Sequence, residues 1–312
     1  MIPICIQAAH QLKNYWMKRI SDNKEERITI TDFISKITLD IIGLVGFNYE
    51  FNSLTSGSEL GRAHNAISEY DLTPIYSALT DCFPFIRKIL FSFNIKYLNG
   101  LKVTKNISEK FVTDIKNNHI LSNNLFSLLV KTNENLSDDE KLDDDELISQ
   151  VKTILLSQVN VHILLSWILQ FLAKNLVHQD CLREELSNAF FDLDHHPTAD
   201  EIDKLKYLDC VLKETLRLVP SVLSLVRKTT KDEIMNGYLV PKETTISISL
   251  NAIHCDPLIW SDNADEFDPS RWLDPNLKSK LSIYNYLPFG AGLRGIAKPL
   301  PGIDLWVSKV DK

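Results

Sequence analysis

The longest apolar stretch of the sequence, residues 146–175, constrains the fold more than any other feature. Apolar residues recur in it for about thirty residues, without a proline or a glycine. At a rise of about 1.5 Å per residue, a helix of this length crosses a domain of this size. A membrane span is implausible because polar residues interrupt the stretch at Lys152, Gln158, Asn160, His162 and Gln170.

A compact amphipathic helix is predicted at the start of residues 207–227. Its apolar residues repeat at three- and four-residue spacing, and Pro220 ends the pattern. Glu214 and Arg217 lie three residues apart on one face, so their side chains can pair or reach together toward a third group. Taken alone, such a pair is usually a solvated surface pair.

Two later motifs change this interpretation. Residues 267–272 are F-D-P-S-R-W, and residues 288–294 are P-F-G-A-G-L-R. An E-x-x-R helix, an F-x-P-x-R-W loop and an F-G-x-G-x-R turn in this order resemble the cytochrome P450 family, and the chain is most similar to its fungal microsomal type. The resemblance implies that Glu214, Arg217 and Arg271 form a buried structural triad, which must be fully hydrogen-bonded to offset its desolvation.

The resemblance implies a mainly α fold with a small β portion, which is the P450 fold, incomplete at both ends. We expect residues 1–294 to form a partial P450 domain and residues 295–312 to form a divergent C-terminal tail. The resemblance implies that the membrane anchor and proline-rich hinge of a microsomal member would precede the point that matches Met1. We therefore expect this chain to be soluble, whereas the full-length family implies the cytosolic face of the endoplasmic reticulum membrane.

The resemblance also implies contacts to a heme cofactor. Phe289, Gly290 and Gly292 match the turn that carries the heme. Arg227 and Arg294 match positions that contact a heme propionate, and both can attract an anionic group.

The thiolate ligand of the family is missing from the sequence. The pattern F-G-x-G-x-R-x-C-x-G places its cysteine at Ile296, and none of the five cysteines lies in this loop. An aliphatic side chain cannot ligate iron or donate electron density to it. The family therefore implies a heme cofactor, but this sequence does not support thiolate ligation. We expect no metal ligand in this loop. We expect the chain as written to be inactive.

The sequence after Arg294 departs from the family in a second way. A long helix normally follows the heme loop, but Pro299, Pro301 and Gly302 break any helix here. A shifted or misjoined reading frame after Arg294 is the simplest explanation, and true divergence is the alternative.

The long helix of residues 146–175 also departs from the family at its catalytic positions. The family's A-G-x-[DE]-T-T falls on residues 156–161, which places Val159 at the acid position and Asn160 at the threonine position. Asn160 can hydrogen-bond oxygen or water but cannot supply protons as an acid does. His162 lies about 200° from Asn160 around the helix, so we interpret it as a packed structural histidine.

The family implies oxidation of a hydrophobic small molecule with O2 and electrons from NADPH-cytochrome P450 reductase. By position, the residues facing the substrate are 157–161 and 222–226. Two alternatives stay open, namely a non-catalytic helical module that binds an apolar ligand or a partner protein, and the product of a defective gene model. A net charge of −7 without a basic stripe argues against a nucleic-acid partner. Scattered cysteines without C-x-x-C spacing suggest reduced thiols.

The remaining pattern predicts further elements. An acidic loop is expected at residues 137–146, before the long helix, and a mobile lid or an irregular packed connection at residues 72–90. Helices are expected at the N-terminus and at residues 28–45, ended by Gly46, as well as at 102–119 and 179–190, and short strands at 238–240 and 244–250.

Overall fold

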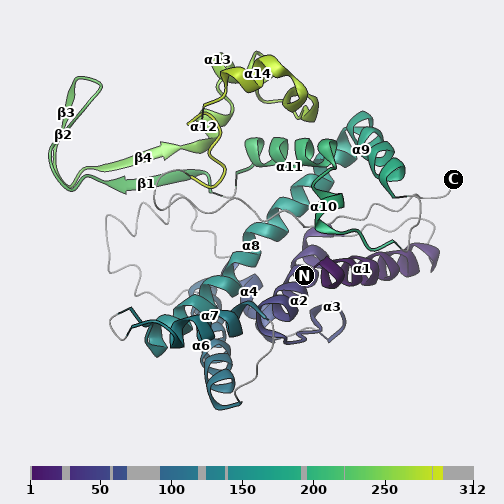
Figure 1. Cartoon of the computed structure of the whole chain (residues 1–312), viewed down its shortest axis with the longest axis vertical. Helices are drawn as coiled ribbons and strands as arrows, with labels where there is room; N and C mark the ends of the chain where they lie inside the picture. The colour runs from purple at the N-terminus through teal and green to yellow at the C-terminus, as the bar shows by residue number, and fades with distance from the viewer. Residues whose placement is uncertain are drawn as a thin grey trace. The chain divides into compact units, whose positions relative to one another are not determined.

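The chain divides into two compact units, Pro3–His162 and Ile163–Val307. The computed structural model describes residues 2–22, 29–56, 59–68, 92–118, 124–137, 140–190, 195–220, 222–282 and 284–290. The boundary between the units falls inside one continuous helix, α8 (Figure 1).

The described part of the first unit is helical. Its elements are α1 (Ile2–Asp22), α2 (Ile30–Phe47), α3 (Ser53–Ser56), α4 (Glu59–Ser68), α6 (Ser92–Asn118), α7 (Leu125–Glu134) and the first part of α8 (Asp144–Lys174).

The second unit contains helices and two short antiparallel ladders. Its helices are the end of α8, α9 (Leu176–Ala189), α10 (Ala199–Ile202), α11 (Lys206–Leu218), α12 (Leu250–His254), α13 (Pro257–Trp260), the 3-10 turn η2 (Pro269–Leu273) and α14 (Pro275–Lys280). Its strands are β1 (Ser224–Lys228), β2 (Glu233–Met235), β3 (Tyr238–Val240) and β4 (Thr245–Ser249). The prediction of a mainly α fold with a small β portion is confirmed.

The predicted long helix is present as α8, with bounds close to those expected. Asp143 Oδ1 accepts a hydrogen bond from the Glu146 N–H, and Glu146 Oε2 accepts one from the Asp143 N–H. This reciprocal pair satisfies backbone donors at the helix start, and acidic residues there also favour the helix dipole. The acidic run therefore leads into the helix N-terminus, as predicted.

Within the described ranges, α8 is also the helix whose length and apolar composition suffice to cross a bilayer. This is weak evidence for a membrane span, because core helices of globular proteins meet the same criterion. Leu147, Val151 and Leu155 are buried in the core of the first unit. These residues use the apolar face of α8 for protein packing.

The core of the first unit is built around stacked aromatic rings. The Phe47 and Phe111 rings stack with centroids 4.7 Å apart, and the Phe126 ring lies 5.8 Å from Phe47. These rings come from α2, α6 and α7, so the cluster joins three helices that are distant in sequence. Aromatic pairs of this kind stabilise beyond their burial alone.

A polar contact fixes α8 against α2. Gln158 is buried, and its side-chain N–H2 group donates to the Ser35 carbonyl and to Thr38 Oγ1, both at 2.7 Å. Such a buried amide is tolerated because its donors are paired, and the pairing sets one register of the two helices.

The predicted end of the second helix was wrong. Gly46 was expected to stop the helix, but α2 continues through it to Phe47, and Asn48 adopts the left-handed conformation with φ 52°. The Asn48 N–H then bonds the Leu44 carbonyl at 3.0 Å. Asparagine is one of the few non-glycine residues that adopt this conformation readily, so it ends the helix in place of glycine.

Other predicted elements are present with shifted bounds. The helix expected at residues 102–119 is α6, which begins earlier, at Ser92, and the helix expected at residues 179–190 is α9. The two expected strands are β3 and β4. The whole of the predicted lid, residues 72–90, lies outside the described residues.

The second unit packs its short sheet beside helices. Strands β1 and β4 pair antiparallel with Arg227 opposite Ile246, and the chain between them forms the β2–β3 hairpin (Figure 1). Asn236 and Gly237 turn this hairpin with positive φ angles of 50° and 83°, which suits a two-residue turn. Contacts of α11 with η2, α9 and α12 form the helical side of this unit.

Gly43 allows α2 to approach the chain that follows it, so we expect Gly43→Ala to lower the free energy of unfolding by about 1–3 kcal/mol. A Cβ atom at Gly43 would lie 2.5 Å from Phe51 Cδ2 and 2.6 Å from the Tyr49 carbonyl oxygen. Urea unfolding measures the change.

The matched control is Gly46→Ala, whose Cβ would lie 3.7 Å from its nearest neighbour, Ile154 Cγ2. Alanine is the better helix former, so this variant should be neutral or stabilised by up to about 1 kcal/mol. Equal losses of stability in both variants would contradict the packing assigned to Gly43.

Candidate functional site

Helix α11 places Glu214 and Arg217 in the interior of the second unit. Both side chains are completely buried, and their three-residue spacing brings them to one helical face. Arg217 Nε donates to Glu214 Oε2 at 2.9 Å and Arg217 Nη2 donates to Oε1 at 2.8 Å, which is a bidentate pair. The alternative of a solvated surface pair is therefore wrong.

The Glu214 carboxylate also accepts hydrogen bonds from the loop that follows α13. Arg271 Nε donates to Oε1 at 2.9 Å, and the Asp268 N–H donates to the same oxygen at 3.0 Å. The Trp272 indole N–H donates to Oε2 at 2.9 Å. With Arg217, these donors surround both oxygens, so the buried negative charge is paired and hydrogen-bonded.

Arg217 uses its remaining N–H groups on backbone carbonyls. Nη1 donates to the His254 carbonyl at 2.7 Å and also to that of Ala264, while Nη2 donates to Glu266 O at 3.1 Å. The guanidinium carbon lies 5.1 Å from the centre of the Trp260 ring. This arrangement combines hydrogen bonding with a cation–π contact.

Arg271 brings the second positive charge, and its guanidinium donates to a different set of carbonyl groups. Its Nη1 donates to Trp260 O at 2.9 Å and its Nη2 to Asn263 O at 2.9 Å, with Asn263 Oδ1 3.2 Å from Nη1. One carboxylate and two guanidiniums leave an excess positive charge, which these carbonyl dipoles balance.

The segment just before the last described residue packs on this network. Tyr286 Oη donates to the Lys213 carbonyl at 3.1 Å, and its ring lies 4.8 Å from that of Trp272. Burial raises the pKa of the Tyr286 hydroxyl above its ordinary value. The segment ends at Phe289 and Gly290, where Gly290 has φ 76°.

Comparison with known proteins identifies this arrangement. The sequence model of the family described as "Cytochrome P450" matches residues 1–295. The chain belongs to the cytochrome P450 family. Cytochrome P450 monooxygenase 128 of Postia placenta is 29% identical over 307 residues, covering 86% of this chain and 56% of that protein. Cytochrome P450 3A2 of Rattus norvegicus is 29% identical over 333 residues, covering 99% of this chain and 63% of that protein.

A bacterial relative carries a second activity in its name. Bifunctional cytochrome P450/NADPH--P450 reductase 2 of Bacillus subtilis is 30% identical over 295 residues, which cover 93% of this chain and 27% of that protein. The chain thus spans little more than half the length of its fungal relative.

The three triad residues predicted from the P450 motifs converge on one site, as their distances show. The structure describes only some of the predicted heme contacts. Phe289 and Gly290 are the last described residues, whereas Gly292, Arg294 and Ile296 lie outside the described residues. Placement of these last three stays a prediction.

Arg227 lies on β1, and the two catalytic positions expected from the family lie on α8. Arg227 is exposed on β1, and its Nη1 donates to the carbonyl of the preceding Val226 at 2.9 Å. Asn160 is exposed, and the side chain of Val159 is not among those described. His162 is partly buried, and burial lowers its pKa, as suits the structural histidine that was expected.

Sequence reasoning missed several residues that complete the network. Trp272 was noted in the F-D-P-S-R-W motif, but its hydrogen bond to Glu214 was not foreseen. His254 was assigned no role, but it is completely buried, with hydrogen bonds to α11 and to the segment before Gly290. A histidine in an otherwise apolar helical turn was the available signal.

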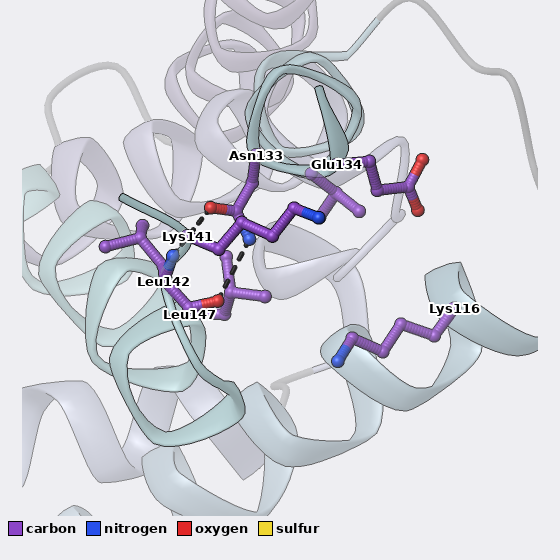
Figure 2. Close-up of a pocket in the computed structure, with 7 residues that line it drawn as sticks. Lys116, Asn133, Glu134, Lys141, Leu142 and Leu147 are labelled. Carbon is purple, nitrogen blue, oxygen red and sulfur yellow. Dashed lines mark hydrogen bonds between the residues drawn. The ribbon is translucent and has the colours of Figure 1, made fainter. Parts of the chain in front are cut away.

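A pocket in the first unit is lined by residues that hold neighbouring elements together (Figure 2). Asn133 of α7 donates to the Leu142 carbonyl at 3.0 Å and accepts from the Leu142 N–H at 2.7 Å. Lys116, on the wall of the pocket, pairs with Asp144. These contacts attach the loop before α8 to α7, so the pocket residues hold the helix start in place.

Glu214→Gln is expected to lower the free energy of unfolding by about 3–5 kcal/mol, because two buried guanidiniums lose their counter-charge. The amide would also direct its own N–H2 group at donors that now bond a carboxylate oxygen. Urea unfolding followed by circular dichroism measures the change.

Asp209→Asn on the same helix is the control, because Asp209 forms an exposed pair with Lys213. Its loss should cost less than about 1 kcal/mol. A Glu214→Gln variant as stable as this control would contradict the role assigned to the network.

His254 gives the fold a pH dependence. Burial lowers the pKa of His254 from 6.5 to about 4. The folded state therefore holds a neutral ring while the unfolded chain becomes protonated below its ordinary pKa, so stability is lost as the pH falls from about 6.5 toward 4. The expected loss from this group is about 3 kcal/mol.

Urea unfolding of the wild type and of His254→Gln at pH 7, 5 and 4 isolates this contribution. Other groups titrate in both proteins, so their effect cancels in the difference between them. The stability gap should narrow as the pH falls, and a gap that stays constant would contradict the buried neutral histidine.

Proposed function

We propose that this chain is the scaffold of a heme monooxygenase that, with the present sequence, lacks the thiolate ligand to the iron. The observation that carries the proposal is a contrast within the chain. The network of Glu214, Arg217 and Arg271 is complete, whereas the family's cysteine position holds Ile296. Structure-forming residues are thus kept and a residue needed for chemistry is lost.

The donor set available to an iron supports this proposal. Heme in a P450 supplies oxygen activation through an axial thiolate that donates electron density to the iron. Ile296 lacks a donor atom, so the residue at the family's cysteine position does not fit a thiolate-ligated heme.

The positions that serve proton delivery in the family support the same conclusion. Val159 has no titratable group, and the Asn160 amide is a hydrogen-bonding group that does not release protons. Neither residue can transfer protons, although the composition of the helix is otherwise ordinary. The loss of the ligand and of the proton relay in one chain favours loss of the chemistry as a whole.

We further propose the setting of the full-length protein from its relatives. A hydrophobic small molecule would be its substrate, and NADPH-cytochrome P450 reductase its electron donor. The Bacillus subtilis relative, named as a P450 and an NADPH–P450 reductase in one protein, supports such a partner. The cytosolic face of the endoplasmic reticulum membrane is the proposed location.

The reduced carbon-monoxide difference spectrum of the purified 312-residue chain supplied with heme tests the proposal. We expect no band of the kind given by thiolate-ligated heme, because residue 296 offers no sulfur. Appearance of that band would show that another cysteine reaches the iron, and it would overturn the proposal.

The variant Ile296→Cys is the matched comparison, because it restores only the ligand atom. A band in this variant alone would assign the loss to that atom, whereas no band in either protein would assign it to the loop as a whole. A stable fold without the band favours a non-catalytic module, and an insoluble chain favours a defective reading frame. Sequencing the transcript past the Arg294 codon separates a misjoined frame from true divergence.

A further inference from the structure

His254 lies at the end of α12 with its ring completely buried between two backbone groups. Nδ1 lies 3.1 Å from the Arg217 carbonyl oxygen at the end of α11. Nε2 lies 2.8 Å from the Leu287 nitrogen. The imidazole therefore bridges two parts of the second unit that are far apart in sequence.

The chemistry of these two partners determines the protonation of the ring. The Leu287 N–H can only donate, so Nε2 must be unprotonated in order to accept. The Arg217 carbonyl can only accept, so Nδ1 must carry the proton. Both bonds are satisfied at once only by a neutral ring with its proton on Nδ1.

Leu287 is where the F-G turn begins. Its carbonyl accepts from the Gly290 N–H at 3.0 Å, which closes the turn that contains Phe289. A Cβ atom on Gly290 would lie 3.4 Å from Leu225 Cδ1 of β1, so the turn passes close to the sheet. The N–H of Leu287 is held by His254 and its carbonyl by the turn, so one imidazole connects the turn to α11.

We propose that His254, as the Nδ1–H tautomer, is the positioning residue that holds the F-G turn, residues 287–290, at its place against α11. The nearby Tyr286 hydroxyl bond to the Lys213 carbonyl holds the preceding residue on the same helix. The two bonds hold the adjacent residues Tyr286 and Leu287. Together they limit the rotation of this segment as well as its distance from α11. This proposal rests on the proposed function only in that the turn leads toward the family's cofactor loop.

The first test is nuclear magnetic resonance of the wild-type 312-residue chain, labelled with 15N and measured without heme at neutral pH. We expect a scalar coupling across the hydrogen bond from the Leu287 nitrogen to His254 Nε2, and an Nδ1 signal typical of a protonated nitrogen. Both signals require the proposed tautomer. A protonated Nε2, or no coupling to Leu287, would overturn the proposal.

The second test compares two substitutions that each keep one half of the bridge. In His254→Gln the side-chain oxygen can still accept from the Leu287 N–H, whereas in His254→Asn the shorter amide can still donate to the Arg217 carbonyl. Loss of one hydrogen bond corresponds to about a tenfold faster local exchange. We therefore expect Leu287 amide exchange to rise about tenfold in His254→Asn and much less in His254→Gln.

Amides in the middle of α11 serve as the internal reference. Exchange of the Leu287 amide is expressed relative to theirs, because a change in the bridge can also lower global stability and so speed exchange throughout α11. Equal acceleration of Leu287 in the two variants, no acceleration in either, or a uniform acceleration that includes α11 would overturn the positioning role. Since no heme is present, these results are independent of the carbon-monoxide spectrum, and either proposal can fail alone.

Discussion

The buried carboxylate of Glu214 is the charge on which the second unit depends. Two guanidiniums and an indole N–H approach it inside the protein, where each lost donor would leave the buried charge less fully compensated. Because Arg217 and Arg271 also bond backbone carbonyls of the chain after α12, the network fixes loop backbone as well as side chains. An otherwise irregular region thereby acquires one conformation.

The retention of this network and the loss of the iron ligand have different physical consequences. A defect in the buried network destabilises the whole unit, whereas an aliphatic residue at a ligand position removes a donor atom without unpairing a buried charge. A chain that has lost its chemistry can therefore keep its scaffold. The bridge through His254 belongs to the scaffold, since it acts through backbone groups of Arg217 and Leu287.

Much of the fold followed from sequence pattern, and the exceptions have local causes. The long apolar repeat predicted α8 nearly to its ends, because periodicity over many residues is a strong signal. The end of α2 was misplaced because asparagine, like glycine, adopts the left-handed conformation, so Gly46 was a misleading stop. The triad was predicted from motif order, whereas Trp272 and His254 gained roles only through contacts with residues far along the chain.

The sequence by itself determined the helical class, the identity of the triad residues and the absence of cysteine at position 296. These are properties of spacing and of side-chain chemistry, which are written residue by residue. Only the tertiary structure decided that Glu214 is completely buried, that its oxygens are shared among several donors, and that His254 connects α11 to the F-G turn. Burial and hydrogen-bond partners depend on which distant segments meet, and local sequence does not encode that.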